Sequence, residues 1–139
     1  MKNTFVATLI AMLFALSVVS CGEDTIDYVH HTDIRYVNET GVKPIQLDFY
    51  CGTEWKISVS INSNDTTFKA TDINIYRWMM PASNDSIIVK FGKMPSKTYS
   101  VYEYVEGVKN PCRSECYEKE TISNTQRKYT FTFTKDMIE

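Results

Sequence analysis

The sequence has few of the residues on which metal and catalytic sites depend. Its only two histidines, His30 and His31, are neighbours. Neighbouring side chains of an extended segment point to opposite sides, so this pair cannot hold one ion without further ligands, and zinc requires three or four. No serine stands in a Gly-x-Ser-x-Gly pattern, and nucleophilic catalysis needs a base beside the nucleophile. We therefore expect no metal, no cofactor and no catalytic residues, and an exposed histidine pair in a linker.

Charge is also spread too evenly to indicate a nucleic-acid ligand. The chain has 15 Lys and Arg residues against 17 Asp and Glu residues, and phosphate recognition needs basic residues that are clustered. Acidic pairs such as Glu103 with Glu106, or Glu115 with Glu118, have the residue types of glycoside hydrolysis. Acidic residues are scattered over every soluble surface, so a small hydrolase is the least favoured function.

The first twenty residues have the layout of a secretory signal. Lys2 is followed by a largely apolar stretch over 5–16 and by small residues at Ser17 and Ser20. The apolar run reaches about 15 residues, fewer than the roughly 20 that a transmembrane helix needs. Val18-Val-Ser-Cys21 resembles the bacterial lipobox, in which the cysteine receives a diacylglyceryl group. The resemblance implies cleavage before Cys21 and a membrane anchor at that residue, since two or more acyl chains make anchoring stable.

Cleavage after residue 20 leaves 139 − 20 = 119 residues, the size of one ordinary domain. Lys2 is the only charged residue lost, so the remaining chain has 14 basic and 17 acidic residues, a net charge of −3. The polar, acidic stretch that begins Gly22-Glu-Asp-Thr-Ile-Asp27 has little apolar surface to bury and predicts a flexible tether over 21–32. The folded domain is then expected over 33–139.

Short strands separated by turns account for most of this domain. Strict alternation of apolar and polar residues is typical of half-buried strands, and 129–134 is the clearest example, with aromatic residues alternating with threonines. Seven or eight such strands predict an all-β fold, a single antiparallel β-sandwich of immunoglobulin-like type. Residues from Thr134 onward allow one helical turn and no more. The expected strands are 34–37, 45–51, 55–61, 73–78, 86–91, 98–104, 116–120 and 129–134.

Three cysteines remain once Cys21 carries lipid, and the expected compartment permits disulfides. An odd number leaves at least one thiol unpaired. Cys51 continues the apolar face of 45–49, where a free cysteine behaves as a small buried hydrophobe. Cys112 and Cys116 flank a polar turn in which a short bridge is sterically possible. We favour a Cys112–Cys116 disulfide with Cys51 free, over a bridge from Cys51 to one of the other two.

Three segments together resemble small β-sandwich lipoproteins of Bacteroides and related bacteria, a family without an assigned function. They are 34–41 (IRYVNETG), 85–91 (DSIIVKF) and 129–134 (YTFTFT) followed by Asp136, and 110–117 (NPCRSECY) is similar to the segment before that family's penultimate strand. The resemblance covers most of the chain after the signal and rests on strand patterns. It implies a β-sandwich and supplies no active-site residues.

The same resemblance has implications for cellular location and for glycosylation. The acidic stretch after Cys21 is similar to the export signal of Bacteroides-type surface lipoproteins, although Thr25 and Ile26 interrupt it; an ordinary linker is the alternative. Three short patterns of Asp, then Ser or Thr, resemble the O-glycosylation acceptor of these bacteria, with acceptors at Thr25, Thr66 and Ser86. Thr66 is expected in a polar turn and Ser86 at the start of a strand, where it would be poorly presented.

Aromatic residues offer the remaining candidates for binding. Tyr50, Tyr102 and Tyr104 fall on the polar side of their expected strands, and exposed rings suit sugars or partner proteins; packing over sheet edges is the alternative. Trp55, in contrast, alternates with polar residues and is expected on the buried face with Ile57. We predict a non-enzymatic interaction module on the outer membrane, at the cell surface or on the periplasmic face, contacting protein, glycan or matrix. An accessory subunit of an uptake or fimbrial assembly is the alternative.

Overall fold

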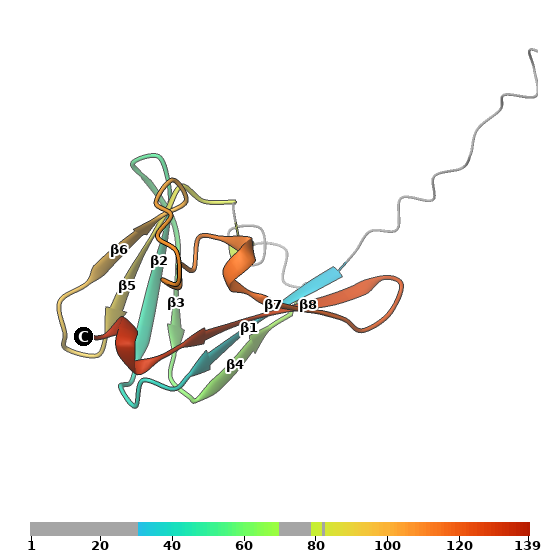
Figure 1. The fold of residues 1–139 in the computed structure, drawn as a ribbon, viewed down its shortest axis with the longest axis horizontal. Helices are drawn as coiled ribbons and strands as arrows, with labels where there is room; N and C mark the ends of the chain where they lie inside the picture. Colours follow the sequence, from blue (N-terminus) through green and yellow to red (C-terminus); the bar gives the residue numbers. More distant parts are fainter. Residues whose placement is uncertain (1–30, 70–78, 82) are drawn as a thin grey trace, which may run out of the picture.

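The computed structural model describes residues 31–69, 79–81 and 83–139, and eight strands within them form two four-stranded sheets (Figure 1). The first sheet has the order β4-β1-β8-β7 and the second the order β3-β2-β5-β6. None of the helices in these ranges is long and apolar enough to cross a membrane. The elements are β1 (His31–Asn38), β2 (Ile45–Cys51), β3 (Glu54–Ile61), β4 (Asp65–Phe68), β5 (Ser86–Phe91), β6 (Lys97–Ser100), η1 (Ser114–Cys116), β7 (Glu118–Thr121), β8 (Gln126–Phe133) and η2 (Lys135–Met137).

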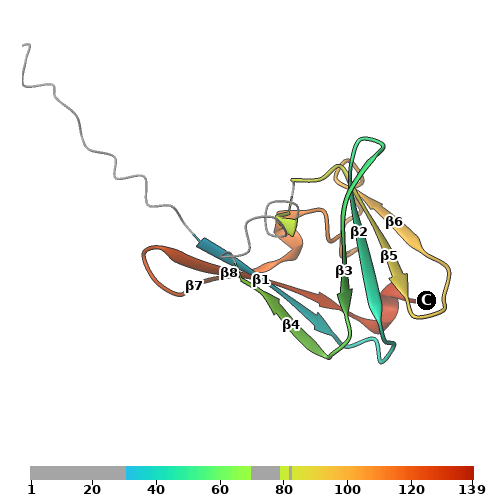
Figure 2. The same cartoon turned by 180° about the vertical axis from the view of Figure 1, so that it is seen from behind.

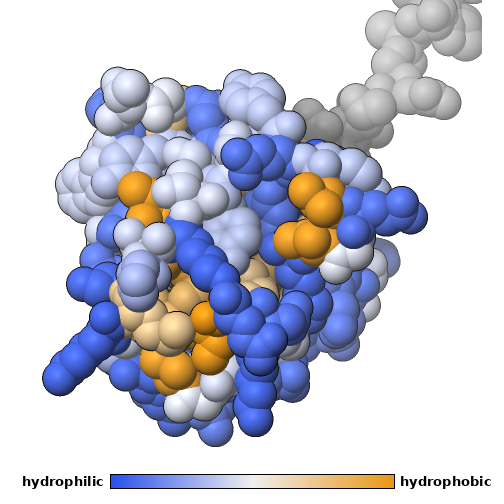
Figure 3. All heavy atoms as spheres, turned by 60° about the vertical axis from the view of Figure 1, so that its left-hand side comes forward, coloured by the Kyte–Doolittle hydropathy of each residue, from blue (hydrophilic) through white to orange (hydrophobic). Residues whose placement is uncertain are grey.

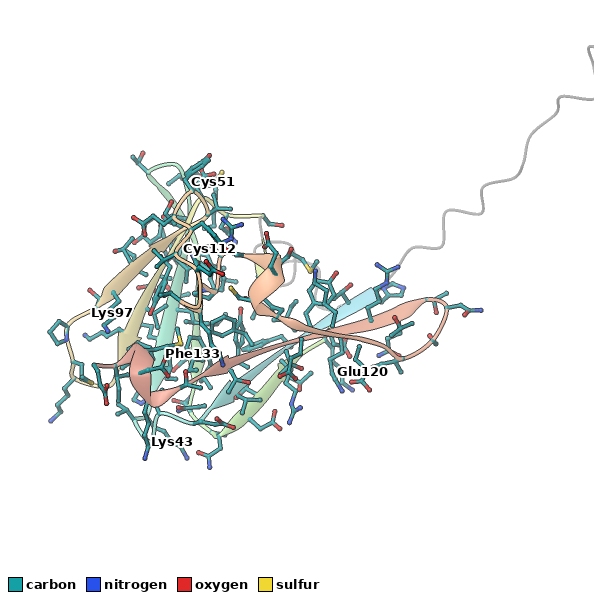
Figure 4. The ribbon with its side chains drawn as sticks, viewed as in Figure 1. Lys43, Cys51, Lys97, Cys112, Glu120 and Phe133 are labelled. Atoms are coloured by element: carbon teal, nitrogen blue, oxygen red, sulfur yellow. The ribbon has the colours of Figure 1, made fainter. Side chains whose placement is uncertain are left out.

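The core lies between the inner faces of the two sheets. Alternate residues of the long strands point inward, and Ile34, Leu47 and Phe131 have no exposed surface. Phe133, labelled in Figure 4, joins the two layers: its ring centroid lies 4.9 Å from that of Phe131 and 6.0 Å from that of Phe91 in the opposite sheet. Burying each such side chain contributes about 1.5–3 kcal/mol. The alternation in the sequence therefore produces the sandwich directly, and the all-β prediction is confirmed.

One pair of strands departs from the antiparallel pairing that dominates the fold. β1 and β8 run parallel, with Ile34 opposite Tyr129 and Tyr36 opposite Phe131. The other strand pairs in the described ranges are antiparallel. A period of two residues says which face of a strand is buried but not which way its neighbour runs. The parallel direction is set by the topology, because β1 and β8 become neighbours in the middle of one sheet.

The observed strand limits confirm some predictions and correct others. β2 and β5 have the predicted limits, and η2 supplies the single helical turn after Thr134. β6 ends at Ser100, because the Ser100 hydroxyl accepts a hydrogen bond from the Tyr102 N–H at 3.2 Å and bends the chain. β4 was missed by the pattern, and the expected strand 73–78 lies outside the described residues. His31 and Thr32 belong to β1, and Thr32 is only 5% exposed. The last two residues of the expected tether, 21–32, are therefore part of the folded domain.

A β-bulge in the β2–β3 hairpin changes the side on which one aromatic residue lies. The strands join through a turn at Gly52 and Thr53, and Gly52 has φ +60°, which a side chain would oppose. Phe49 pairs with Ile57, yet Tyr50 pairs with Trp55, so one extra residue stands on β3. Trp55 is consequently on the outer face, 55% exposed, which overturns its expected burial. Cys51, at the end of β2, is exposed rather than buried.

Candidate binding surfaces

The outer face of the β3-β2-β5-β6 sheet carries a fixed aromatic ring. Strand partners share a face, so Tyr50 and Trp55 lie together there, as do Asp48 and Ser58. We call the set Gln46, Asp48, Tyr50, Trp55 and Ser58 the aromatic face. Tyr50 is half-buried, whereas the Trp55 ring is largely open to solvent. An indole more than half exposed, beside a second ring and three polar side chains, is a surface able to hold a ligand.

A chain of hydrogen bonds holds the Trp55 ring in place. The indole Nε1–H donates to the Ser58 hydroxyl at 3.0 Å, and that hydroxyl donates to the Asp48 carboxylate. The Gln46 amide donates to the same carboxylate at 3.0 Å. Because the indole N–H is satisfied within the protein, the ring is oriented before any ligand arrives. The Asp48 carboxylate remains half-exposed next to it as a hydrogen-bond acceptor.

The three tyrosines predicted as binding aromatics do not form one cluster. Tyr50 belongs to the aromatic face, while Tyr102 and Tyr104 lie in the loop after β6 and are 81% and 67% exposed. The Tyr102 hydroxyl reaches Asp85 Oδ1 at 3.5 Å, and the other Asp85 oxygen accepts the Gly52 N–H. Tyr102 therefore stands at the end of the aromatic face nearest the β2–β3 turn. Tyr104 instead packs under the Arg113 guanidinium, 4.8 Å from its ring centroid.

Trp55 was missed because strict alternation assigns it to the core. The length of the hairpin turn could have revealed its position. A two-residue connection at 52–53 pairs Tyr50 with Trp55, and Phe49 would then oppose Lys56. Only an extra residue on β3 restores the pairing of Phe49 with Ile57. Hairpin register combined with the core pattern thus predicts the bulge and the exposed tryptophan.

The opposite outer face, on the β4-β1-β8-β7 sheet, is occupied by ion pairs. Arg35 donates from Nε to Asp65 at 2.9 Å, and Lys128 lies 2.6 Å from Glu120. The Arg35 guanidinium lowers the pKa of the Asp65 carboxyl below its usual range. Such exposed pairs contribute little to stability, and they leave this face well hydrated. The two outer surfaces of the sandwich therefore differ in chemistry, and the aromatic side chains favour the β3-β2-β5-β6 side for ligand contact.

A hollow of about 540 Å³ lies beside the edge strand β6, and we call it the β6 pocket. Figure 3, which brings this side of the molecule forward, shows apolar surface gathered among hydrophilic side chains. The volume is within the range of ligand pockets. The pocket is lined by Lys97, Thr98 and Tyr99 of β6, by the loop after β6 and by η2. The lining residues of the last two parts are Glu103, Val105, Gly107, Val108, Lys109, Asn110, Asp136 and Met137.

The β6 pocket contains two carboxylates, on Glu103 and Asp136, the feature that a small hydrolase would need. A glycosidase requires one carboxylic acid with a raised pKa to protonate the leaving group. The neighbouring Thr134 hydroxyl, with a smaller contribution from Lys109, instead lowers the pKa of Asp136. Asp136 therefore does not match the carboxylic acid of that mechanism.

The three described cysteines are free thiols, which corrects the predicted Cys112–Cys116 disulfide. Cys112 is buried and its thiol donates to the Tyr99 carbonyl at 3.2 Å, whereas the Cys116 sulfur accepts the Asn110 N–H at 3.4 Å. Each sulfur is thus engaged with a backbone group instead of with the other sulfur. Burial raises the pKa of the Cys112 thiol to about 12. The prediction that Cys51 is free is confirmed.

The remaining predicted residues are separated from one another. Thr66 lies in β4 rather than in a turn and is half-buried, with its hydroxyl 2.9 Å from that of Ser63, while Ser86 begins β5 as predicted. Cys21 and Thr25 lie outside the described residues, and so does His30. His31 is exposed in β1, and the described ranges hold no group of three or more His, Cys, Asp or Glu residues arranged for a metal.

Comparison with known proteins adds no relative: no family model matches the chain, and no curated protein and no solved structure is significantly similar to it.

Proposed function

We propose that the chain is a non-enzymatic, lipid-anchored binding module of a bacterial envelope, and that its aromatic face contacts a glycan. The supporting observation is an indole that is 55% exposed yet held in one orientation by Ser58 and Asp48. Leaving a large ring in water forgoes the stabilisation that burial would contribute, about 1.5–3 kcal/mol. A ring that is fixed and exposed at once is suited to receive a ligand.

The chemistry around this ring favours a sugar over a protein partner. A pyranose presents an apolar C–H surface on one side and hydroxyl groups at its rim. On the aromatic face, Trp55 and Tyr50 offer flat apolar surface, and Gln46 and Asp48 offer a donor and acceptors beside it. A stable protein interface generally needs an apolar centre and about 1,000 Å² or more of buried surface. The polar neighbours of Trp55 do not form such a centre.

Titration with an oligosaccharide array tests this proposal. Trp55→Ala and Tyr50→Ala are expected to weaken binding at least tenfold, because each removes a stacking surface. Tyr104→Ala is the matched control, since Tyr104 is also an exposed aromatic residue but lies away from the aromatic face. Binding that is equal in all three variants, or no binding by the wild-type protein, would contradict the glycan assignment.

The lipid anchor and the location of the domain at the cell surface are separate parts of the proposal. The signal-like 1–20 segment and the lipobox-like residues before Cys21 support lipidation. Metabolic labelling with a fatty-acid analogue should mark the wild-type protein and not Cys21→Ala. The interrupted acidic stretch and the similarity to Bacteroides-type lipoproteins support display at the cell surface. Protease added to whole cells should then remove the domain, whereas protection would indicate the periplasmic face.

The alternative function, an accessory subunit of an envelope assembly, is favoured by one observation, the β6 pocket beside an open sheet edge. A subunit of this kind would co-purify with the same partner from native membranes in repeated preparations. Recovery as a clean monomer would count against it.

A further inference from the structure

The edge strand β6 presents unpaired backbone groups to the β6 pocket. β6 pairs with β5 alone, and Tyr99 stands opposite Ile87. The Val101 N–H donates to the Asp85 carbonyl, so the odd-numbered residues here form their hydrogen bonds toward β5. Backbone groups alternate in direction along a strand, and the Thr98 N–H and C=O therefore point away from the sheet. No residue in the described ranges pairs with either group.

The loop that lines the pocket together with Thr98 carries two exposed apolar side chains. Val105 and Val108 line the pocket with 62% and 56% of their surface open to solvent, and the buried Met137 also lines it. Figure 1 places β6 at the outer edge of its sheet with η2 close to the same side. An open strand edge with apolar side chains across from it matches the two needs of an added strand, which are backbone partners and recesses for alternate side chains.

The loop after β6 is also held in position. The buried Asn110 amide donates to the Ser100 carbonyl at 2.8 Å and to the Glu103 carbonyl at 3.1 Å, and its oxygen accepts the Cys112 N–H at 2.9 Å. Because the Ser100 carbonyl is already satisfied, pairing with an incoming strand is confined to Thr98 and the residues before it. The site is therefore short and preformed.

Another edge of the sandwich is protected in the way usual for natural sheets. β7, at the end of the other sheet, carries Glu118, Lys119 and Glu120, and the four residues of the strand are exposed. Charges on an edge strand discourage pairing with a second chain. Both views show the β7–β8 hairpin projecting from the body (Figures 1 and 2). The exposed valines of the loop beside β6 contrast with this charged edge.

We infer that the β6 pocket takes a short extended peptide segment of a partner protein, which adds to the sheet beside β6. The segment accepts a hydrogen bond from the Thr98 N–H, donates one to the Thr98 carbonyl and directs apolar side chains toward Val105 and Val108. The pocket has no excess charge, because two basic residues, Lys97 and Lys109, balance two acidic ones, Glu103 and Asp136. The backbone hydrogen bonds and the apolar contacts therefore select the ligand. This site is separate from the aromatic face and does not depend on the glycan proposal.

Panning a displayed library of random octapeptides on the folded protein provides the probe. Recovered peptides are synthesised and titrated against the wild-type protein, Thr98→Val and Thr98→Pro. Proline is tolerated where an edge N–H faces solvent, and it removes the donor that the inference requires while keeping the Thr98 carbonyl position as an acceptor. We expect binding to fall at least tenfold with Thr98→Pro and with Val105→Ser, and to be unchanged with Thr98→Val.

A second series keeps the test decisive if Thr98→Pro does not fold. Each recovered peptide is resynthesised with single N-methyl groups along its backbone. A paired strand loses binding at alternate positions only, because every second N–H faces the other way. Failure to recover any binding peptide, indifference to Thr98→Pro in a folded variant, or insensitivity to N-methylation would overturn the inference, whatever the outcome of the glycan titration.

Discussion

Replacing Asn110 with alanine tests how the loop between β6 and η1 is held. Asn110 is only 6% exposed. Its side-chain amide makes three hydrogen bonds to the backbone, to the carbonyls of Ser100 and Glu103 and from the N–H of Cys112. At about 1 kcal/mol for each, their loss should lower the free energy of unfolding by about 3 kcal/mol. In a domain of this size 1 kcal/mol corresponds to about 4 °C, so the melting temperature should fall by about 12 °C.

The assay is urea unfolding followed by circular dichroism, with thermal melting alongside it. Asn62→Ala is the matched control, since Asn62 is exposed and its side chain accepts only one long hydrogen bond, at 3.3 Å from the Ser60 hydroxyl. It should change the free energy of unfolding by less than about 0.5 kcal/mol. Should Asn110→Ala unfold at the same urea concentration as Asn62→Ala, the proposed role of this amide in holding the loop would be refuted.

Three further predictions concern thiols, pH and backbone strain. In a Cys21→Ser form, iodoacetamide at pH 8 should modify the exposed Cys51 first and Cys112 only after unfolding, since burial raises the pKa of the Cys112 thiol to about 12; mass spectrometry before and after denaturation would expose a disulfide as two missing modifications. Arg35 lowers the folded-state pKa of the Asp65 carboxyl. The ionised carboxylate therefore contributes fully to the stability of the fold above pH about 4, and this contribution is lost as the pH falls through the folded pKa. Between pH 7 and pH 3, urea unfolding should show a smaller loss of unfolding free energy for Asp65→Asn than for the wild type, and equal losses would contradict the pairing. Gly92→Ala should destabilise by about 1–2 kcal/mol, because Gly92 has φ +55° and the new Cβ would lie 2.8 Å from Val42 Cγ1; a melting temperature equal to that of the wild type would show that the turn relaxes.

Local pattern was enough for the fold class because burial in a two-layer sandwich repeats every second residue. The 45–51 and 86–91 segments were predicted to the residue, since their alternation is bounded by turn-forming residues on both sides. The β4 strand was missed because Asp65-Thr-Thr-Phe68 is short and polar at its start. It is a strand by virtue of pairing with β1, which no local pattern reveals.

The candidate sites depended much more on tertiary structure. Tyr50 was identifiable because it alternates along its strand with Leu47 and Phe49, which belong to the buried face. Trp55 required the register of a hairpin, and one extra residue on β3 moved it from the core to the surface. The β6 pocket required β6 and the loop after it, within 97–110, to meet η2 at 136–137, which lies further along the chain.

The sequence by itself determined that this is a small all-β domain, and it supplied the signal-like and lipobox-like pattern on which the expected anchor rests. Both are local properties, read from alternation and from a few adjacent residues. The tertiary structure alone decided that β1 and β8 run parallel, that the cysteines at 112 and 116 bond to backbone groups, and which aromatic ring is presented to solvent. These outcomes depend on which strands become neighbours and in what register, and contacts between residues far apart in the chain settle both.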